Sequence, residues 1–121
     1  MIYTGYYAKL KKYTEDGLIP ISIAMKTPKF YTGTEFKALA PTWNIFSKWK
    51  SGEISNDQYI ELFKKEVLDK LNKVQIKNFL NSFKDDIILL CYEKSSDFCH
   101  RHIVGQWISN EFNIEVQEYP I

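Results

Sequence analysis

The residue types that most readily carry chemistry gather in one short stretch in the last third of the chain. The stretch supplies two thiols, a carboxylate, an amine, an imidazole and a guanidinium, from Cys91, Glu93, Lys94, Cys99, His100 and Arg101. A thiolate is a nucleophile, glutamate and histidine move protons, and lysine and arginine hold anions. We therefore predict a site here that binds an anion, in particular a phosphorylated or nucleotide-like ligand.

Three chemistries fit these residue types. General acid–base work by Glu93 and His100 is the interpretation we favour. A strand, a cysteine, a loop and a helix also form the layout of rhodanese-type and tyrosine-phosphatase-type enzymes, but those carry an arginine a few residues after the nucleophile, and Arg101 is too distant from Cys91. Metal binding by Cys91, Cys99, His100 and His102 is disfavoured, because adjacent cysteine and histidine rarely reach one ion, so we expect neither a metal nor a cofactor.

Each residue also has a purely structural interpretation. A buried Cys91 is a small apolar residue, and Glu93 with Lys94 forms an ordinary solvated pair. An ion pair between Arg101 and Glu93 would order the loop without any catalysis. In this alternative the protein is a non-catalytic binding or regulatory module, and the stretch is a structural lock. The gathering of so many reactive types around one loop favours the site, with Cys91, Glu93, Cys99 and His100 as its catalytic residues.

The elements around the stretch predict where it lies. Residues Ile87 to Cys91 form a continuous apolar run, which is typical of a central parallel strand covered on both faces. A helix is expected to follow as far as about Phe112, with Ser96 or Asp97 as its N-cap. Ligands of open parallel sheets bind between such a strand end and the next helix. Helical spacing from Val104 places Arg101 and His100 on the core side, and Cys99 and His102 nearer the opposite face.

The rest of the chain predicts an α/β protein with an open, mostly parallel sheet of about four strands and helices on both faces. Strands are expected at Ile2–Tyr7, Ile19–Ala24 and Ile114–Glu118, with a turn at Tyr13–Gly17, a long loop from Lys26 to Pro41, and helices at Pro41–Lys50, from Ser55 to about Leu71, and around Val74–Phe83. Ser55 and Gln58 form a capping-box pattern, and Gly5 inside a strand indicates a bulge or a close approach. The 121 residues are expected to form a single domain.

Composition excludes several classes of protein. With 16 basic and 15 acidic side chains the net charge is +1, which argues against duplex DNA as the main partner. Two cysteines are too few for the disulfide framework of a small secreted domain. No apolar run approaches the roughly 20 residues that cross a bilayer. We expect a cytoplasmic protein with reduced thiols, and the sequence leaves its oligomeric state open.

The motif resembles a known family. Leu89-Leu90-Cys91-Tyr92-Glu93-Lys94 and Cys99-His100-Arg101 are similar to the signature of domain-of-unknown-function family 488 (DUF488), which is widespread in bacteria and phages. Thr4-Gly5-Tyr6 resembles that family's N-terminal glycine motif, and Leu39-Ala40-Pro41 and the final strand are compatible with it. The resemblance implies a compact α/β fold and a pocket built from Cys91, Glu93, Cys99, His100 and Arg101. It implies no established reaction.

The chain departs from the family pattern after the second strand. Many members carry an acid and an arginine there, whereas this chain has Ile23-Ala24-Met25-Lys26-Thr27-Pro28. Lys26 replaces the positive charge, but the acid is absent. We assign ligand binding to the basic residues Arg101, Lys94 and Lys26 and to Tyr6. A base of the ligand would stack on Tyr6, Phe30 or Tyr31.

Overall fold

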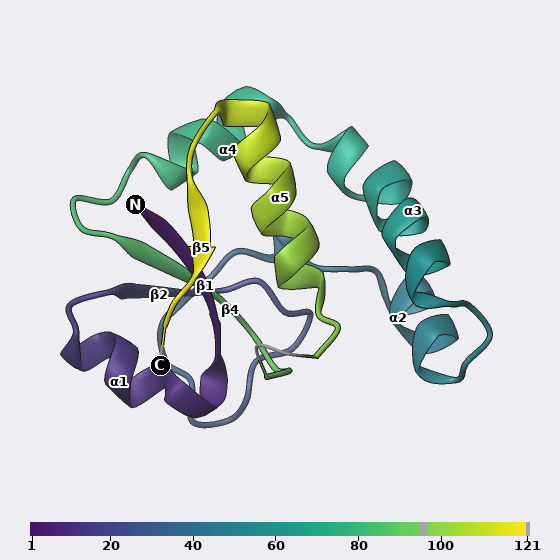
Figure 1. Cartoon of the computed structure of the whole chain (residues 1–121), viewed down its shortest axis with the longest axis horizontal. Helices are drawn as coiled ribbons and strands as arrows, with labels where there is room; N and C mark the ends of the chain where they lie inside the picture. The colour runs from purple at the N-terminus through teal and green to yellow at the C-terminus, as the bar shows by residue number, and fades with distance from the viewer. Residues whose placement is uncertain (95–96, 121) are drawn as a thin grey trace.

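The computed structural model describes residues 1–94 and 97–120 and confirms the α/β class, with one open sheet in which every strand pair is parallel. Figure 1 shows the sheet crossing the molecule, with α5 lying over it. The strand order is β3-β2-β4-β1-β5, formed by β1 (Ile2–Tyr6), β2 (Ile19–Ser22), β3 (Thr34–Glu35), β4 (Ile87–Cys91) and β5 (Val116–Glu118).

Helices cover both faces of the sheet, as predicted. They are α1 (Leu10–Glu15), α2 (Trp43–Lys50), α3 (Asn56–Glu66), α4 (Lys73–Leu80) and α5 (His100–Phe112), and short 3₁₀ turns occupy Tyr7–Lys9, Lys37–Leu39 and Leu68–Lys70. In Figure 1, α1 lies at one end of the molecule and α2 and α3 at the other. The capping box at the start of α3 is confirmed, since the side chains of Ser55 and Gln58 each bond the other's backbone N–H.

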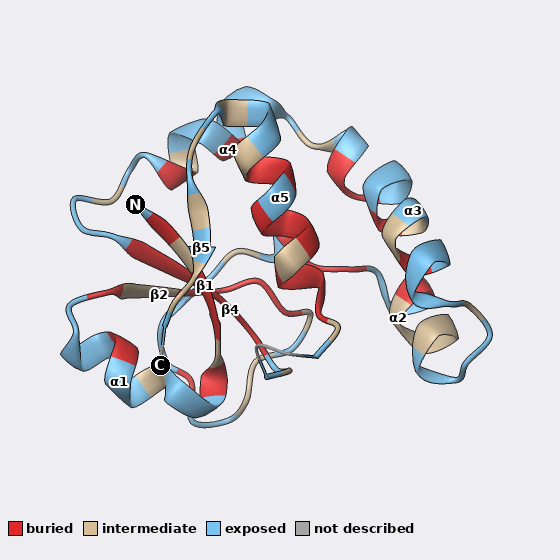
Figure 2. Cartoon of the chain, in the orientation of Figure 1, coloured by how far each residue is buried: buried red, intermediate tan, exposed pale blue. Residues whose placement is uncertain are grey.

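The strand β4 divides two hydrophobic cores. All five of its residues are buried, so it satisfies the prediction of a strand covered on both faces. Ile87 and Leu89 face the larger core, which contains residues of α2 to α5, whereas Ile88 and Leu90 face the smaller core with Tyr13 of α1. Figure 2 shows β4 as buried and shows buried residues through much of α5. The rigid end of β4 therefore carries Cys91.

Two short elements were not predicted. The helix α1 extends to Glu15, so the turn expected at Tyr13–Gly17 is wrong over its first three residues and only Asp16 and Gly17 form it. At six residues the helix is too short to show an amphipathic period. The strand β3 lies inside the segment expected to be a loop, and it raises the strand number from about four to five. Both of its residues are exposed, so no alternation of apolar residues marks it. It joins the sheet through parallel pairing with β2.

Helix starts differ from the predicted ones in an informative way. The helix α2 begins at Trp43 with Thr42 as its N-cap, so Pro41 precedes the helix instead of opening it. The helix α5 begins at His100, and its N-cap is Cys99, whose side chain makes no capping hydrogen bond. Asp97 is therefore not the N-cap, and Ser96 lies outside the described residues. Among the described residues no helix is both long and apolar enough to cross a membrane.

Gly5 marks a close approach and not a bulge. The register between β1 and β4 runs without interruption from Ile2 opposite Ile87 to Tyr6 opposite Cys91. A Cβ atom at Gly5 would lie 2.7 Å from the Tyr13 hydroxyl and 2.8 Å from Cδ1 of Ile88. The absence of a side chain at Gly5 therefore lets α1 pack onto the sheet.

Buried tyrosines are expected to make the fold sensitive to alkaline pH. Tyr31 donates its hydroxyl to the carbonyls of Thr34 (2.6 Å) and Pro20 (3.1 Å), and burial raises its pKa to about 12. Above about pH 10 the unfolded chain releases this phenolic proton while the folded chain keeps it, so stability falls as the pH rises. We expect urea midpoints to decrease between about pH 10 and 11, and to decrease less in Tyr31→Phe. Equal pH dependence in the two proteins would contradict this assignment.

Candidate active site

A cavity of about 720 Å³ opens beyond the carboxyl end of β4. Its polar end is formed by Cys91, Glu93, Cys99 and His100, all of which were predicted as site residues. Aromatic side chains form the walls, from Trp43, Phe46, Trp49, Tyr59, Tyr92 and Phe98, and Lys26 and Lys50 supply positive charge. The site therefore lies where a parallel sheet normally binds its ligand, between a strand end and the start of the next helix.

His100 is held in one orientation by two contacts. Its Nε2 lies 2.7 Å from the carbonyl oxygen of Ile23, and because a carbonyl only accepts, Nε2 must carry the hydrogen and donate it. Its Nδ1 lies 3.3 Å from Sγ of Cys91. The ring also packs edge-on against Phe63, with 5.7 Å between centroids. The imidazole thus presents Nδ1 to the thiol, in the manner of a base fixed by a third group.

Cys99 lies beside Cys91, contrary to the expectation that it would fall nearer the opposite face. That expectation applied helical spacing to a residue that precedes the helix. As the N-cap, Cys99 has an extended backbone (φ −152°, ψ 142°), and its side chain is buried. Its Sγ, the Sγ of Cys91 and a ring nitrogen of His100 all lie within 4.8 Å of one another.

The contact between the two thiols moves their pKa values in opposite directions. The pKa of Cys99 is lowered, first by a hydrogen bond from the Cys91 thiol and then by His100 and the backbone N–H of Arg101. The pKa of Cys91 is raised, first by the same contact with Cys99 and then by burial. Burial also raises the pKa of Glu93, whose Oε2 lies 3.9 Å from Sγ of Cys91. A thiolate is thus stabilised beside the cavity, next to a carboxyl group that holds its proton more tightly than usual.

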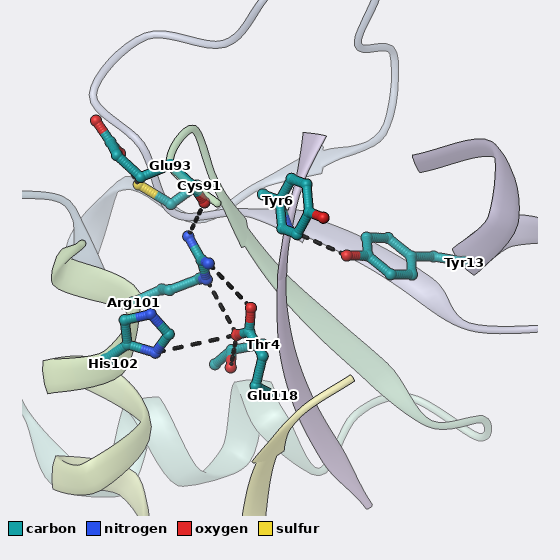
Figure 3. A network of polar contacts seen from close by, with 8 residues as sticks. All are labelled: Thr4, Tyr6, Tyr13, Cys91, Glu93, Arg101, His102 and Glu118. Atoms are coloured by element: carbon teal, nitrogen blue, oxygen red, sulfur yellow. Dashed lines mark hydrogen bonds and ion pairs between the residues drawn. The ribbon is translucent and has the colours of Figure 1, made fainter. Parts of the chain in front are cut away.

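Arg101 is fully buried, and Figure 3 shows its guanidinium between Glu93 and Glu118. Its Nη2 and Nε donate to the two carboxylate oxygens of Glu118 on β5, at 2.9 and 3.1 Å, and its Nη1 donates to the backbone carbonyl of Glu93 at 2.6 Å. The ion pair considered with the Glu93 carboxylate is therefore formed with Glu118 instead. Thr4 also donates its hydroxyl to Glu118, at 2.6 Å. The guanidinium anchors the loop after β4 to the edge of the sheet.

Of the four predicted ligand-binding residues, the structure places one at the cavity. Lys26 lines the cavity, whereas Lys94, Tyr6 and Arg101 are not among its described lining residues. Tyr6 instead lies under the Arg101 guanidinium, with Cζ 5.7 Å from the ring centroid. Lys94 is exposed.

The cavity's aromatic residues were not predicted as site residues. Neither Phe30 nor Tyr31 lines the cavity, and α2 and Phe98 provide the aromatic surface in their place. A signal was present in the sequence, because the aromatic residues of α2 directly follow the long loop predicted at Lys26–Pro41.

A family model described as "DUF488-N3a: Active DUF488-N3 subclade" matches residues 14–111. The chain belongs to the DUF488 family. The match covers the whole stretch from Cys91 to Arg101 and confirms the resemblance drawn from that motif, whereas Thr4-Gly5-Tyr6 and Glu118 lie outside the matched range. Comparisons of this DUF488 protein with curated proteins and with solved structures gave no significant match.

Proposed function

We propose that this DUF488 protein is an enzyme that binds a nucleotide-like ligand and acts on it with a cysteine thiolate. The observation that carries the proposal is the meeting of Cys91, Cys99 and His100 within 4.8 Å at one end of a cavity. A nucleophile, a base and a group that orients the base are the parts that covalent catalysis needs. Here the Ile23 carbonyl orients His100, and the position of Cys99 before the first turn of α5 favours the thiolate.

The roles divide as follows. The Cys99 thiolate, held by Cys91, forms a bond to an electrophilic atom of the ligand while the bond from that atom to the leaving group breaks, and water then displaces the cysteine. His100 holds or returns the proton of the thiol pair through Nδ1, and Glu93 donates a proton to the leaving group. Arg101 is a positioning residue, because it fixes the Glu93 backbone without reaching the cavity. These roles need reduced thiols, and the cytoplasmic location expected from the cysteine count provides that condition.

The residues that line the cavity favour a ligand with a flat ring and a negative charge. Base stacking on aromatic side chains is favourable and independent of which base is bound. Trp43 is 71% exposed although it is large and apolar, so a stacked base would cover a surface that now faces water. Lys26 and Lys50 lie at the same cavity, where their charges attract a phosphate group. Lys50 already approaches the Trp49 ring, with Nζ 5.9 Å from its centroid.

Thiol alkylation tests the proposal on the folded protein. The chain has only two cysteines, so iodoacetamide adducts are readily assigned by mass spectrometry. We expect one fast adduct, on Cys99, which AMP slows by occupying the cavity. In His100→Ala the rate should fall by roughly 100-fold, as expected when a positioned base is lost. His102→Ala is the matched control, because His102 does not line the cavity, and its rate should equal that of the wild type.

The outcomes separate enzyme from structural module. Equal alkylation rates in wild type and His100→Ala, or no reaction of either thiol in the folded chain, would reject thiolate catalysis. The alternative, a non-catalytic module with the motif as a structural lock, is favoured by the buried Arg101–Glu118 pair. It predicts that Glu93→Ala and His100→Ala both lower the unfolding temperature substantially, and that AMP leaves it unchanged. The enzyme proposal predicts that AMP raises the unfolding temperature by linkage.

A further inference from the structure

The donors at the polar end of the cavity have the composition of a metal site. Two sulfurs and one imidazole nitrogen are ligands that Zn²⁺ and related divalent ions prefer. In a tetrahedral zinc centre, neighbouring sulfur and nitrogen ligands lie about 3.5 to 3.8 Å apart, given the usual bond lengths. The measured separation of Cys91 Sγ and His100 Nδ1 is 3.3 Å, and all three donor atoms lie within 4.8 Å of one another. Changes of up to about 1 Å in these separations would close the site around an ion.

The second contact of His100 matches a metal ligand as well. A histidine that binds a metal through one nitrogen usually donates its other N–H to a carboxylate or a backbone carbonyl. His100 does this with Nε2 and the Ile23 carbonyl at 2.7 Å, which leaves the lone pair of Nδ1 directed at the sulfurs. The adjacency of Cys99 and His100, which argued against a metal in the sequence, is no obstacle. Cys99 is extended and His100 is helical, so both side chains reach the same point.

We propose that Cys91, Cys99 and His100 bind one borderline divalent cation such as Zn²⁺, with the fourth coordination position open to the cavity. Three protein ligands and one exchangeable position are the pattern of reactive zinc sites, whereas structural sites carry four protein ligands. Glu93 lies beside this position, with its Oε2 3.9 Å from Sγ of Cys91. The ion occupies both thiols and the imidazole lone pair. Binding therefore inhibits the thiolate chemistry proposed above, and this consequence alone rests on that proposal.

Co²⁺ tests the site directly, because thiolate ligation to cobalt gives charge-transfer absorption in the near ultraviolet. The full chain, reduced and stripped with a chelator, would be titrated with Co²⁺ without oxygen. We expect saturation at one equivalent, intense charge-transfer bands, and their loss on adding Zn²⁺. Cys91→Ser, Cys99→Ser and His100→Ala should each weaken binding at least roughly tenfold. His102→Ala, which removes the chain's other histidine, should bind like the wild type.

A measurement on the wild type alone keeps the test independent of how the variants fold. One equivalent of Zn²⁺ should protect Cys99 from iodoacetamide, and a chelator should restore its reactivity. The proposal is overturned if no saturable one-to-one complex forms, if Cys99→Ser binds as tightly as the wild type, or if only His102→Ala loses the bands. A metal complex in a chain whose thiols are inert without metal would reject the proposed catalysis and keep the metal site. Reactive thiols in a chain that forms no metal complex would reject the metal site and keep the proposed catalysis.

Discussion

Replacing Arg101 by methionine is expected to lower the free energy of unfolding by about 3–5 kcal/mol. The guanidinium is fully buried and makes three hydrogen bonds, two to the Glu118 carboxylate and one to the Glu93 carbonyl. Methionine fills a similar volume but removes the positive charge beside the Glu118 carboxylate. Only 23% of the Glu118 side chain is exposed, so water replaces that charge poorly. The cost arises mainly from that carboxylate and from the Glu93 carbonyl, which loses its donor.

Urea unfolding of Arg101→Met, Arg101→Lys and Arg101→Met/Glu118→Leu would measure this effect. Lysine keeps the charge but lacks the two-pronged donor geometry, so it should recover only part of the loss. The double variant should be less damaged than Arg101→Met, because it removes the carboxylate together with the guanidinium. A loss below about 1 kcal/mol in Arg101→Met would show that the pair is as weak as a surface ion pair.

Gly5→Ala is expected to destabilise the protein by about 1–3 kcal/mol, although it adds a single methyl group. The new Cβ would lie 2.7 Å from the Tyr13 hydroxyl, and Tyr13 is fully buried between α1 and the sheet. To make room, either Tyr13 leaves its position or β1 shifts against β4. Tyr13→Phe removes the nearest atom, so the cost of Gly5→Ala should be smaller in that background.

Gly105→Ala is the matched control for this substitution. A Cβ at Gly105 would lie 3.1 Å from Cγ1 of Val116. The partly buried Val116 can move away from this contact more easily than the fully buried Tyr13 ring can move away from a Cβ at Gly5. Alanine also gains about 1 kcal/mol of helix propensity over glycine at that position in α5. Equal unfolding midpoints for Gly5→Ala and the wild type would refute the close-packing account of Gly5.

Much of the fold was predictable because its strongest signals are local. The five apolar residues of β4 identify a central strand, and Ser55 with Gln58 identifies the start of α3. The elements that were missed are short and gain their stability from elsewhere. The strand β3 has two exposed residues and depends on the β2 edge for its hydrogen bonds, so its own composition carries no signal.

The gathering of the candidate site residues was predictable from the sequence, but their contacts were not. Cys91, Glu93, Cys99 and His100 are close in sequence and lie together at the cavity. The only partner of Arg101 that the structural interpretation considered is Glu93, whereas the observed partner, Glu118, reaches Arg101 through the pairing of β5 with β1. The apolar stripes of the helices favour an ordinary core at the aromatic wall, because a helical stripe does not distinguish packing from the lining of a cavity.

The position of β1 in the sheet also has a consequence for how the protein is made. The strand β1 lies between β4 and β5, so both of its neighbours come from the last third of the chain. During synthesis, one edge of this first strand stays unpaired until Cys91 at the end of β4 has left the ribosome, and the other edge until Glu118 at the end of β5 has. Pairing between segments so far apart in the sequence slows folding and leaves an aggregation-prone strand edge unpaired until folding is complete. Nascent chains of this protein are therefore expected to be clients of ribosome-associated chaperones.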